Sequence, residues 1–552
     1  MKTFVIYFLT ALLPLVSHSQ ALDVEWSPKI PYDNKVDGNF VGILGINSKY
    51  IFTRFNDIAK DFEKMEKNVR LVSFDKQTME KVNVVTVKDS KNKANSKEYK
   101  GLTFHNYFVS EDAVYLFWIK LTFFKTEIYA ETFDNDLNRF KPLTLVYQNT
   151  ADIKNFKQGA YLLIGNENNG GQLLLGTEMP GMEGENIKLS YKILKPDLTS
   201  DISGEVDLPI KITQRVVVNE LSSVYTLGDD GNLHLRTKYA LPKDDLKQQS
   251  KGEQDFYSAY SIINLKNRKV KSFPFKFEQK NIFDFDVKMT VNSAKVFGFF
   301  SDVSKDKKGK DTHGIFYSVI NSEELEIEDV HFIYFSKEQL DRLFSDDMED
   351  RQDQKLLVSK SKAESMDGAL ASNYTIEKVE VMDDGNIVIF CSRVKIKEEI
   401  SANSDRHRTI YLYTTIKNNV TAFKISKEGK IEWASNLDRK VTYGGYKIAD
   451  LKVIKDKSRL LVCYGNDYEM NTQSKDFLSK NTLSASRDFM EYALFDYETG
   501  AYIRKEFIIN NKNTPKGERK GISQRRLQIR ENSFYTSCWN GGYYIGRLSI
   551  KD

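Results

Sequence analysis

Eight segments of this chain repeat one pattern, and that repetition limits the fold more than any other feature of the sequence. Each segment is a stretch in which apolar and polar residues alternate, then a short polar turn, then a second alternating stretch, as in "EKVEVMDDGNIVIFCS". The eight segments begin at Phe40, Leu102, Ala160, Ser222, Asp286, Glu377, Ala449 and Gln524. Alternation with a period of two around a short turn is typical of a β-hairpin. The sequence therefore predicts eight hairpins.

A third strand-like stretch follows each hairpin, and in most copies a fourth comes after it. Examples are "LVSFDKQTMEKVNVVTV" from Leu71 and "YSIINLKNRKVKSFPF" from Tyr260. Four antiparallel strands that recur along a chain are the pattern of β-propeller blades, which leave only short and protected sheet edges. We therefore expect an all-β fold, a β-propeller of eight four-stranded antiparallel blades, with seven blades as the alternative. Such a ring accommodates residues 20–552 as one domain.

The last blade lacks a fourth strand, because the sequence given ends on its third, "YYIGRLSIKD". Proteins avoid open sheet edges. The stretch "DVEWS", residues 23–27, alternates and stops before Pro28. We therefore predict that residues 23–27 pair with residues 543–550 and close the ring.

The letters "DDGN" occur twice, at residues 229–232 and 383–386. A calcium loop needs further oxygen ligands at fixed offsets, as in D-x-[DN]-x-[DN]-G, and neither copy supplies them. Both copies lie between the first and second strands of a repeat, where Gly and Asn accept the positive φ of a hairpin turn. We interpret them as turns and predict no metal site.

The chain resembles the β-propeller superfamily over residues 23–552. The stretch "AFKISKEGKIEWAS" from Ala422, which includes Trp433, is similar to the outer strands of PQQ-type propeller repeats. Quinone-dependent dehydrogenases of the eight-bladed type carry adjacent cysteines at the cofactor, and this chain has none. We therefore expect no cofactor. Its three cysteines, Cys391, Cys463 and Cys538, stand in apolar runs and are predicted to be small buried core residues.

The first residues have the layout of a secretory signal peptide. One lysine precedes an apolar run at residues 4–16, and small residues follow at Ser17 and Ser19. We expect cleavage after Ser19, so that residues 1–19 are removed; an uncleaved anchor is the alternative. The mature chain is then exported, periplasmic or extracellular, and has no transmembrane segment. A formal net charge of +4 over 552 residues gives no bulk attraction to nucleic acid, and we expect a monomer.

Long insertions gather on one side of the predicted ring. In a propeller, the turns between the first and second strands and between the third and fourth strands of each blade lie on one side, which we call the turn face. The remaining connections lie on the other side, which we call the loop face. Long second-to-third connections are predicted from Tyr239, Ser301, Lys395 and Asn466. The longest insertion, residues 335–375 between blades five and six, opens on the same side, and Ser336 with Gln339 predicts a capping box at the start of an amphipathic helix. This helix is either a clip on the rim or a lid or docking element.

Loops held on a rigid scaffold are where binding and catalysis usually reside. The candidate binding residues on the loop face are Asp302, Lys305, Lys310, His313, Arg406, His407, Arg408, Asp467 and Glu469. No zinc helix, P-loop or nucleophile elbow occurs in the sequence. The leading hypothesis is a non-catalytic binding module for a protein or glycan. The alternative is a carbohydrate-active enzyme, a hydrolase or lyase, whose carboxylates would converge at the mouth of the central channel.

Overall fold

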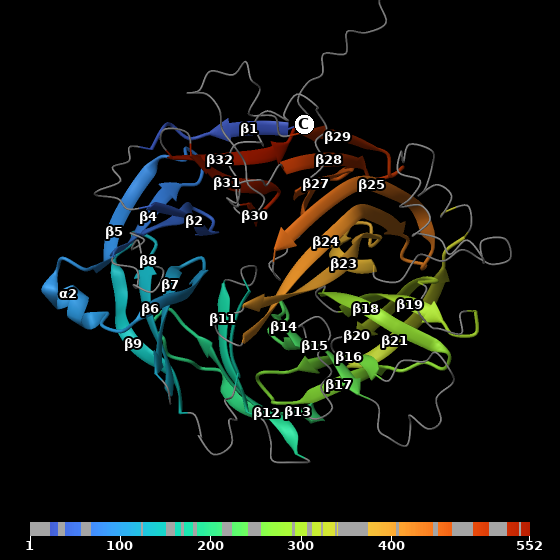
Figure 1. Cartoon of the computed structure of the whole chain (residues 1–552), viewed down its shortest axis with the longest axis horizontal. Helices are drawn as coiled ribbons and strands as arrows, with labels where there is room; N and C mark the ends of the chain where they lie inside the picture. The colour runs from blue at the N-terminus through green and yellow to red at the C-terminus, as the bar shows by residue number, and fades with distance from the viewer. Residues whose placement is uncertain are drawn as a thin grey trace, which may run out of the picture.

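The structure, a computed structural model, is a ring of eight four-stranded antiparallel sheets (Figure 1). The prediction of a β-propeller with eight blades is confirmed, and the seven-blade alternative is wrong. The structure describes residues 22–551 with gaps at 31–38, 57–67, 123–124, 151–159, 167–170, 180–184, 212–222, 241–255, 290–292, 306–311, 322–323, 337–338, 340–373, 404–407, 445–450, 466–489, 507–526 and 540–542. Residues 1–19, the predicted signal peptide, lie outside the described residues.

The blades follow one another along the chain, and in blades one to seven the strands are paired in chain order, from the channel outward (Figure 1). Blades one to four are β2 (Asn39–Ile46), β3 (Tyr50–Asn56), β4 (Asn68–Asp75) and β5 (Lys81–Asp89); β6 (Thr103–Val109), β7 (Ala113–Thr122), β8 (Lys125–Asp134) and β9 (Arg139–Thr150); β10 (Ala160–Asn166), β11 (Gln172–Met179), β12 (Asn186–Leu194) and β13 (Ser203–Lys211); and β14 (Ser223–Leu227), β15 (Leu233–Ala240), β16 (Phe256–Ile263) and β17 (Val270–Phe275). Blades five to eight are β18 (Lys280–Met289), β19 (Ser293–Asp302), β20 (Gly314–Asn321) and β21 (Glu326–Tyr334); β22 (Tyr374–Val381), β23 (Ile387–Asn403), β24 (Arg408–Ile425) and β25 (Ile431–Gly444); β26 (Lys452–Lys455), β27 (Arg459–Gly465), β28 (Met490–Asp496) and β29 (Tyr502–Glu506); and β30 (Gln528–Arg530), β31 (Ser533–Trp539) and β32 (Tyr543–Ile550) with β1 (Leu22–Trp26). A short helix, α2 (Lys93–Glu98), links blades one and two.

The N-terminal strand closes the ring, as predicted. β1 pairs antiparallel with β32 from Leu22↔Ile550 to Trp26↔Gly546, so it is the outermost strand of blade eight (Figure 1). Two backbone hydrogen bonds continue the contact beyond the strand, from Ser27 N–H to the Ile545 carbonyl at 2.8 Å and from Ile30 N–H to the Tyr543 carbonyl at 2.9 Å. β1 therefore covers the edge of β32 and completes blade eight as a four-stranded sheet.

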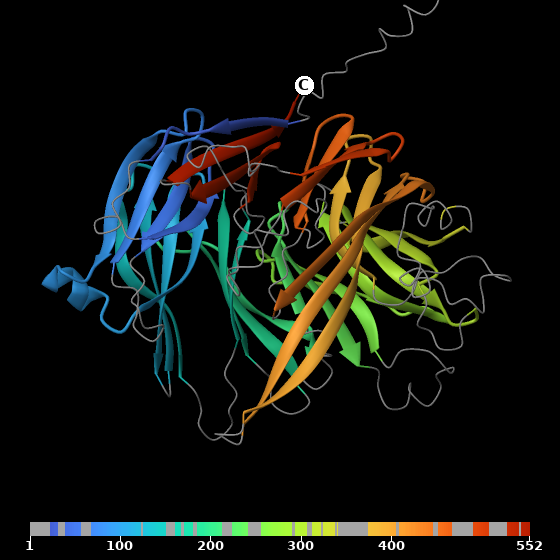
Figure 2. The ribbon, with the colours of Figure 1, turned by 45° about the horizontal axis from the view of Figure 1, so that its top comes forward.

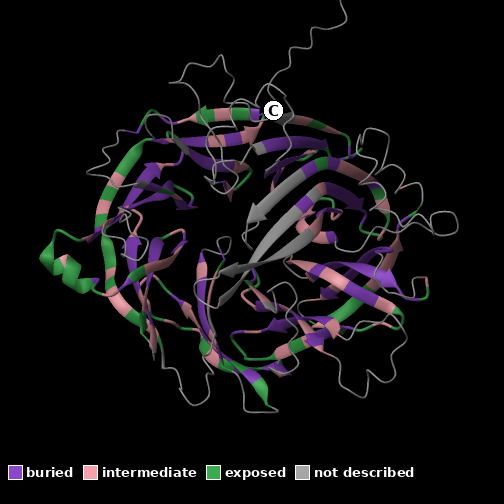
Figure 3. Ribbon diagram, viewed as in Figure 1, coloured by how far each residue is buried: buried purple, intermediate pink, exposed green. Residues whose placement is uncertain are grey.

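The core consists of apolar clusters between neighbouring blades. Between blades five and six, for example, Phe297 and Ile315 pack with Ile389 and Phe423. An inner strand is packed on both faces, so it reads as a continuous apolar run: residues 113–118 of β7, "AVYLFW", are all buried. Exposed residues accumulate on the outer strands (Figure 3).

Both "DDGN" segments form hairpin turns on the turn face, as predicted. Gly231 and Gly385 adopt φ values of 74° and 84°. The aspartate side chains bond within the structure: Asp230 Oδ1 accepts from Asn232 N–H at 3.0 Å, and Asp384 Oδ2 accepts from the Tyr497 hydroxyl at 2.7 Å. Asp230 thus holds its own turn, and Asp384 ties its turn to blade seven.

The second-to-third connection of blade six differs from the prediction. The segment expected as a loop from Lys395 is a continuation of β23 and β24, which stay paired up to Asn403↔Arg408 (Figure 2). Its charged residues suggested a loop, but isoleucine, threonine and tyrosine recur among them, and these residues favour strands. We call the paired backbone from Val394↔Lys417 to Asn403↔Arg408 the blade-six arm.

The start of the insertion at residues 335–375 matches the predicted capping box. Gln339 N–H donates to Ser336 Oγ at 3.1 Å, and Ser336 N–H donates to Gln339 Oε1 at 2.9 Å. The remaining helix lies outside the described residues. No helix in the described part of the chain is long and apolar enough to span a bilayer.

Candidate functional site

The four strands of blade five bring polar residues together at their loop-face ends. Lys280 is the first residue of β18, Asp302 the last of β19 and Tyr334 the last of β21, while His313 directly precedes β20. In an antiparallel sheet the starts of alternate strands lie beside the ends of their neighbours. Lys280 is accordingly paired with Asp302 in the register.

The carboxylate of Asp302 is the centre of this group. Its Oδ2 accepts hydrogen bonds from Lys280 Nζ at 2.5 Å and from the Tyr334 hydroxyl. Lys280 Nζ also donates to the Tyr334 hydroxyl oxygen at 2.7 Å. Its Oδ1 accepts from Ser304 twice, from Oγ at 2.5 Å and from the backbone N–H at 3.0 Å. Asp302 is 2% exposed, so its charge is compensated inside the protein. We call Lys280, Asp302, Ser304, His313 and Tyr334 the Asp302 cluster.

His313 is held by the backbone of the same strand end. The Asp302 N–H donates to His313 Nδ1 at 3.1 Å, so Nδ1 carries no proton and the neutral ring has its proton on Nε2. The ring is buried, and the His313 N–H donates to the Phe300 carbonyl at 2.9 Å. His313 therefore stabilises the strand end.

The electrostatics of the Asp302 cluster fix its protonation. Burial alone would raise the pKa of Asp302, but hydrogen bonds from Lys280, Ser304 and Tyr334 outweigh burial and hold the pKa well below its usual range. Burial lowers the pKa of Lys280, but its bonds to Asp302 and Tyr334 more than offset this and raise it. The carboxylate and the ammonium are thus both charged at neutral pH. A carboxyl with a lowered pKa and an ammonium with a raised pKa are both poorly matched to proton transfer at neutral pH.

Lys305 extends this site toward solvent. Its ammonium lies 4.3 Å from the centre of the Tyr334 ring, a cation–π contact. Of the nine candidate residues, the structure therefore brings together Asp302, Lys305 and His313. Lys310, Arg406, His407, Asp467 and Glu469 lie outside the described residues, and Arg408 begins β24 with an undescribed side chain.

Lys280 and Tyr334 were missed by the sequence reasoning. The search on the loop face considered the residues that follow second strands, and these two residues begin a first strand and end a fourth strand. The signal that could have found them is register, because the loop-face ends of all four strands of one blade meet at one edge.

Two further carboxyl groups belong to the first strands of blades five and six, Asp284 in β18 and Glu377 in β22. Asp284 in β18 accepts a hydrogen bond from Ile376 N–H in β22 at 2.9 Å, so the innermost strands of blades five and six are joined beside Glu377. Burial raises the pKa of Asp284. Burial would also raise the pKa of Glu377, but the positive charges of Arg439 and Lys417, each 3.1 Å away, lower this pKa. The side chain of Glu377 is 2% exposed, which seals it from the channel.

Other buried histidine and cysteine residues have structural roles. His234 lies between Tyr260, whose hydroxyl is 2.5 Å from Nδ1, and Asp230, whose Oδ1 is 3.0 Å from Nε2. Cys391 and Cys463 are buried free thiols, as predicted, and burial raises both pKa values. The side chain of Cys538 lies outside the described residues.

The ring of eight blades and its N-terminal closure define the chain as an eight-bladed β-propeller. No protein-family model matches it, and no curated protein matches it in sequence. Among solved structures it is similar to the WD40 domain of SCAP from fission yeast, with 7% identity and a TM-score of 0.36 over 96% of this chain and 99% of that one. It is also similar to an α-L-arabinanase from Penicillium chrysogenum (10% identity, TM-score 0.29, 70% and 91% covered) and to prolyl oligopeptidase B from Galerina marginata (9%, 0.29, 67% and 37%). At these identities and scores the likeness is one of fold only.

Proposed function

We propose that this propeller is an exported, non-catalytic binding module that recognises a protein or glycan through its loop face, with the Asp302 cluster as part of the contact. The observation that carries the proposal is the saturation of Asp302 by four hydrogen bonds on its two oxygens. A carboxylate bonded in this way is a poor proton acceptor, and it holds Lys280 and Tyr334 in fixed positions. Fixed polar groups on a rigid edge suit recognition.

The charge of the exposed part of this site indicates the chemistry of the ligand. The side chain of Lys280 is 19% exposed, and Lys305 is half-buried against the Tyr334 ring. Two ammonium groups around one phenol ring favour an anionic or hydroxyl-rich partner.

A matched pair of lysine variants tests this proposal. Lys305→Gln removes the ammonium from the Tyr334 ring without touching the bonds to Asp302. Lys427→Gln is the control, because Lys427 stands in the third-to-fourth turn of blade six, on the turn face, and its side chain is 68% exposed. The probes are a glycan array and the proteins retained from an envelope extract. We expect Lys305→Gln to lose retained ligand by about tenfold and the control to match the wild type; equal retention by all three forms would overturn the proposal.

Export is tested separately. If the signal peptide at residues 1–19 is cleaved, the mature protein in an envelope or culture fraction begins at Gln20, as N-terminal sequencing would show. An intact N-terminus in the cytoplasmic fraction would contradict export without bearing on the binding face.

A carbohydrate-active enzyme remains the second candidate, and Asp284 is the observation that favours it. The pKa of Asp284 is raised and that of Glu377 is lowered. A glycosidase likewise pairs a protonated general acid with an ionised second carboxylate. The burial of Glu377 by Arg439 and Lys417 argues against it. Release of reducing sugar from polysaccharides by the wild type, abolished in Asp284→Asn with the fold intact, would favour the enzyme over the binding module.

A further inference from the structure

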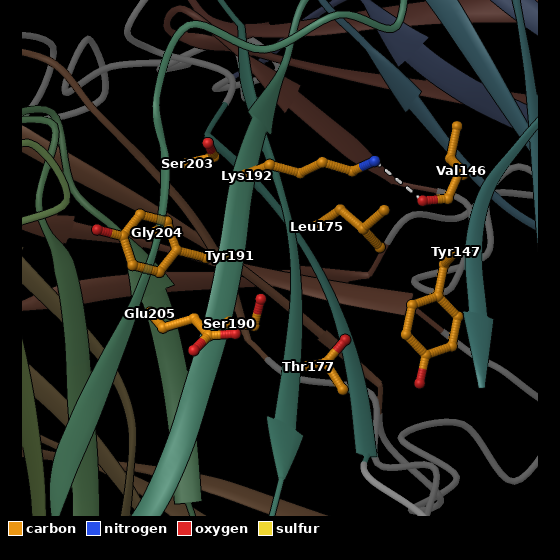
Figure 4. Close-up of a pocket in the computed structure, with 10 residues that line it drawn as sticks. All are labelled: Val146, Tyr147, Leu175, Thr177, Ser190, Tyr191, Lys192, Ser203, Gly204 and Glu205. Atoms are coloured by element: carbon orange, nitrogen blue, oxygen red, sulfur yellow. Dashed lines mark hydrogen bonds between the residues drawn. The ribbon is translucent and has the colours of Figure 1, made fainter. Parts of the chain in front are cut away.

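A cavity of about 400 Å³ opens between blades two and three, away from the Asp302 cluster (Figure 4). One wall is the second half of β9, with Tyr147, and the other is formed by β11, β12 and β13 of blade three. The volume falls within the roughly 300–1,000 Å³ of small-molecule sites. The cavity is therefore large enough for a ligand of the size of a sugar.

The packing between these two blades explains why the cavity exists. Phe117 and Tyr115 of β7 pack against Leu173 and Leu175 of β11, and this apolar cluster fills the inner part of the interface. Farther out, the pairing of β8 with β9 shifts register at three places. Such irregularities bend and twist a strand, so β9 diverges from blade three and leaves the outer part of the interface open.

Lys192 supplies a fixed positive charge at the wall of this cavity. Its Nζ donates to the Val146 carbonyl at 2.9 Å, which bridges the two blades and uses one of three ammonium donors (Figure 4). Burial lowers the pKa of Lys192, and no carboxylate among the described residues forms an ion pair with it. An anionic group beside Nζ would compensate this half-buried charge.

The remaining lining is rich in groups that bond to hydroxyls. Thr177 and Ser190 each offer a donor and an acceptor, and Glu205 offers acceptors on the same side of the cavity (Figure 4). The ring of Tyr147 stands opposite them and provides an apolar surface. One cation, several hydroxyl partners and one aromatic ring match a ligand that carries one carboxylate, several hydroxyls and an apolar C–H face.

We propose that the cavity between β9 and blade three binds a sugar acid of the hexuronate class, with the carboxylate on Lys192 and the sugar hydroxyls on Thr177, Ser190 and Glu205. The site goes beyond the proposed loop-face recognition, because it uses different blades and no residue of the Asp302 cluster. It stands even if loop-face recognition fails.

Calorimetric titration of the full chain tests the proposal with matched sugars. D-galacturonate and D-galactose differ only in the carboxylate, so we expect galacturonate to bind about tenfold more tightly. Lys192→Met should remove this preference, and Lys192→Arg should keep it. Lys195→Met is the control, since Lys195 follows β12 outside the cavity and its side chain is 47% exposed.

Three further measurements keep the test decisive. The melting temperature of Lys192→Met shows whether loss of the Val146 bridge has unfolded the blade. Ser190→Ala should weaken galacturonate and galactose alike because it removes only an uncharged hydroxyl partner. Lys305→Gln in blade five should leave galacturonate affinity unchanged, which separates this site from the loop face. Failure of galacturonate to bind, equal affinity for the two sugars, or unchanged affinity in Lys192→Met would each overturn the proposal.

Discussion

Glu131 illustrates, at the scale of one residue, how a buried carboxyl makes the stability of a blade depend on pH. Its side chain is 0% exposed in β8, and it accepts hydrogen bonds from the Tyr99 hydroxyl at 2.7 Å and from Trp118 Nε1 at 2.7 Å. Arg139 Nη2 lies 2.8 Å from it. Burial nevertheless raises its pKa to about 7. The folded chain thus holds a proton on Glu131 that the unfolded chain releases at lower pH.

The sign of the pH effect follows from this raised pKa. The stabilising contribution is complete below the unfolded pKa, near 4.5, and is lost as the pH rises through about 7. We expect wild type to lose on the order of 3 kcal/mol between pH 5 and pH 8 from this group at most. Denaturant unfolding of wild type and Glu131→Gln across that range measures it: the variant should have the flatter profile. Parallel profiles would contradict the prediction.

The pair of Lys280 and Asp302 gives a second prediction at this scale. Lys280→Met leaves a buried carboxylate without its cation, so we expect a loss of about 2 kcal/mol in the free energy of unfolding. Removing both charges in Lys280→Met/Asp302→Asn should cost less than the sum of the two single changes, because no charge is then left uncompensated. Strict additivity in this double-mutant cycle would show that the 2.5 Å contact does not couple the two residues.

At the scale of the element, blade six shows how an arm is attached to a blade. Each of the four strands has a register shift at the same height in the sheet. The shifts lie at Glu377 in β22, Ser392 in β23, Asn419 in β24 and between Leu437 and Lys440 in β25. Asn419 adopts a φ of 47° there. Bulges bend a sheet and re-aim its side chains. The bend falls where the blade ends and the blade-six arm begins.

Glu377 joins the strands at these register shifts through ion pairs. It lies 3.1 Å from Arg439, whose side chain is fully buried, and 3.1 Å from Lys417. We expect Glu377→Gln to leave two buried cations without this carboxylate and to cost about 3 kcal/mol. Hydrogen exchange should then accelerate in β23, β24 and β25 but not in blade two. Unchanged protection in blade six would show that the charges do not anchor the arm.

The same element shows where sequence reasoning succeeds and fails. Alternation predicted the hairpin at residues 377–392, including its turn at residues 383–386, because a strand with one apolar and one polar face alternates these residues with a period of two. It failed beyond Lys395, where lysine and glutamate occupy positions of a strand that continues past the packed blade. There the backbone of β23 stays paired with β24. The Asp302 cluster was only partly predicted for a related reason: its members meet through register across four strands.

At the scale of the whole molecule, closure joins the two ends of the described chain. Residues 22–30 contribute the outermost strand of blade eight, and their removal would expose the edge of β32. Closure also has a steric component, since a Cβ on Gly546 would lie 2.7 Å from the ring of Trp26. The ring is thus fastened by a ladder of hydrogen bonds and by one aromatic side chain that packs on a glycine.

Two changes at this seam separate the ladder from the packing. Deleting residues 20–30 removes both, so the melting temperature should fall by several degrees, and β32 should lose hydrogen-exchange protection. Gly546→Ala keeps every paired residue but forces the Trp26 ring away, and we expect a smaller loss, about 1–3 kcal/mol. Restoring space with Gly546→Ala/Trp26→Leu should recover part of that loss, because the shorter side chain accommodates the new methyl group. Lys195→Met on blade three serves as the distant control. If the deletion leaves both the melting temperature and the protection of β32 unchanged, the ring is held by the blade interfaces alone, and β1 is dispensable for closure.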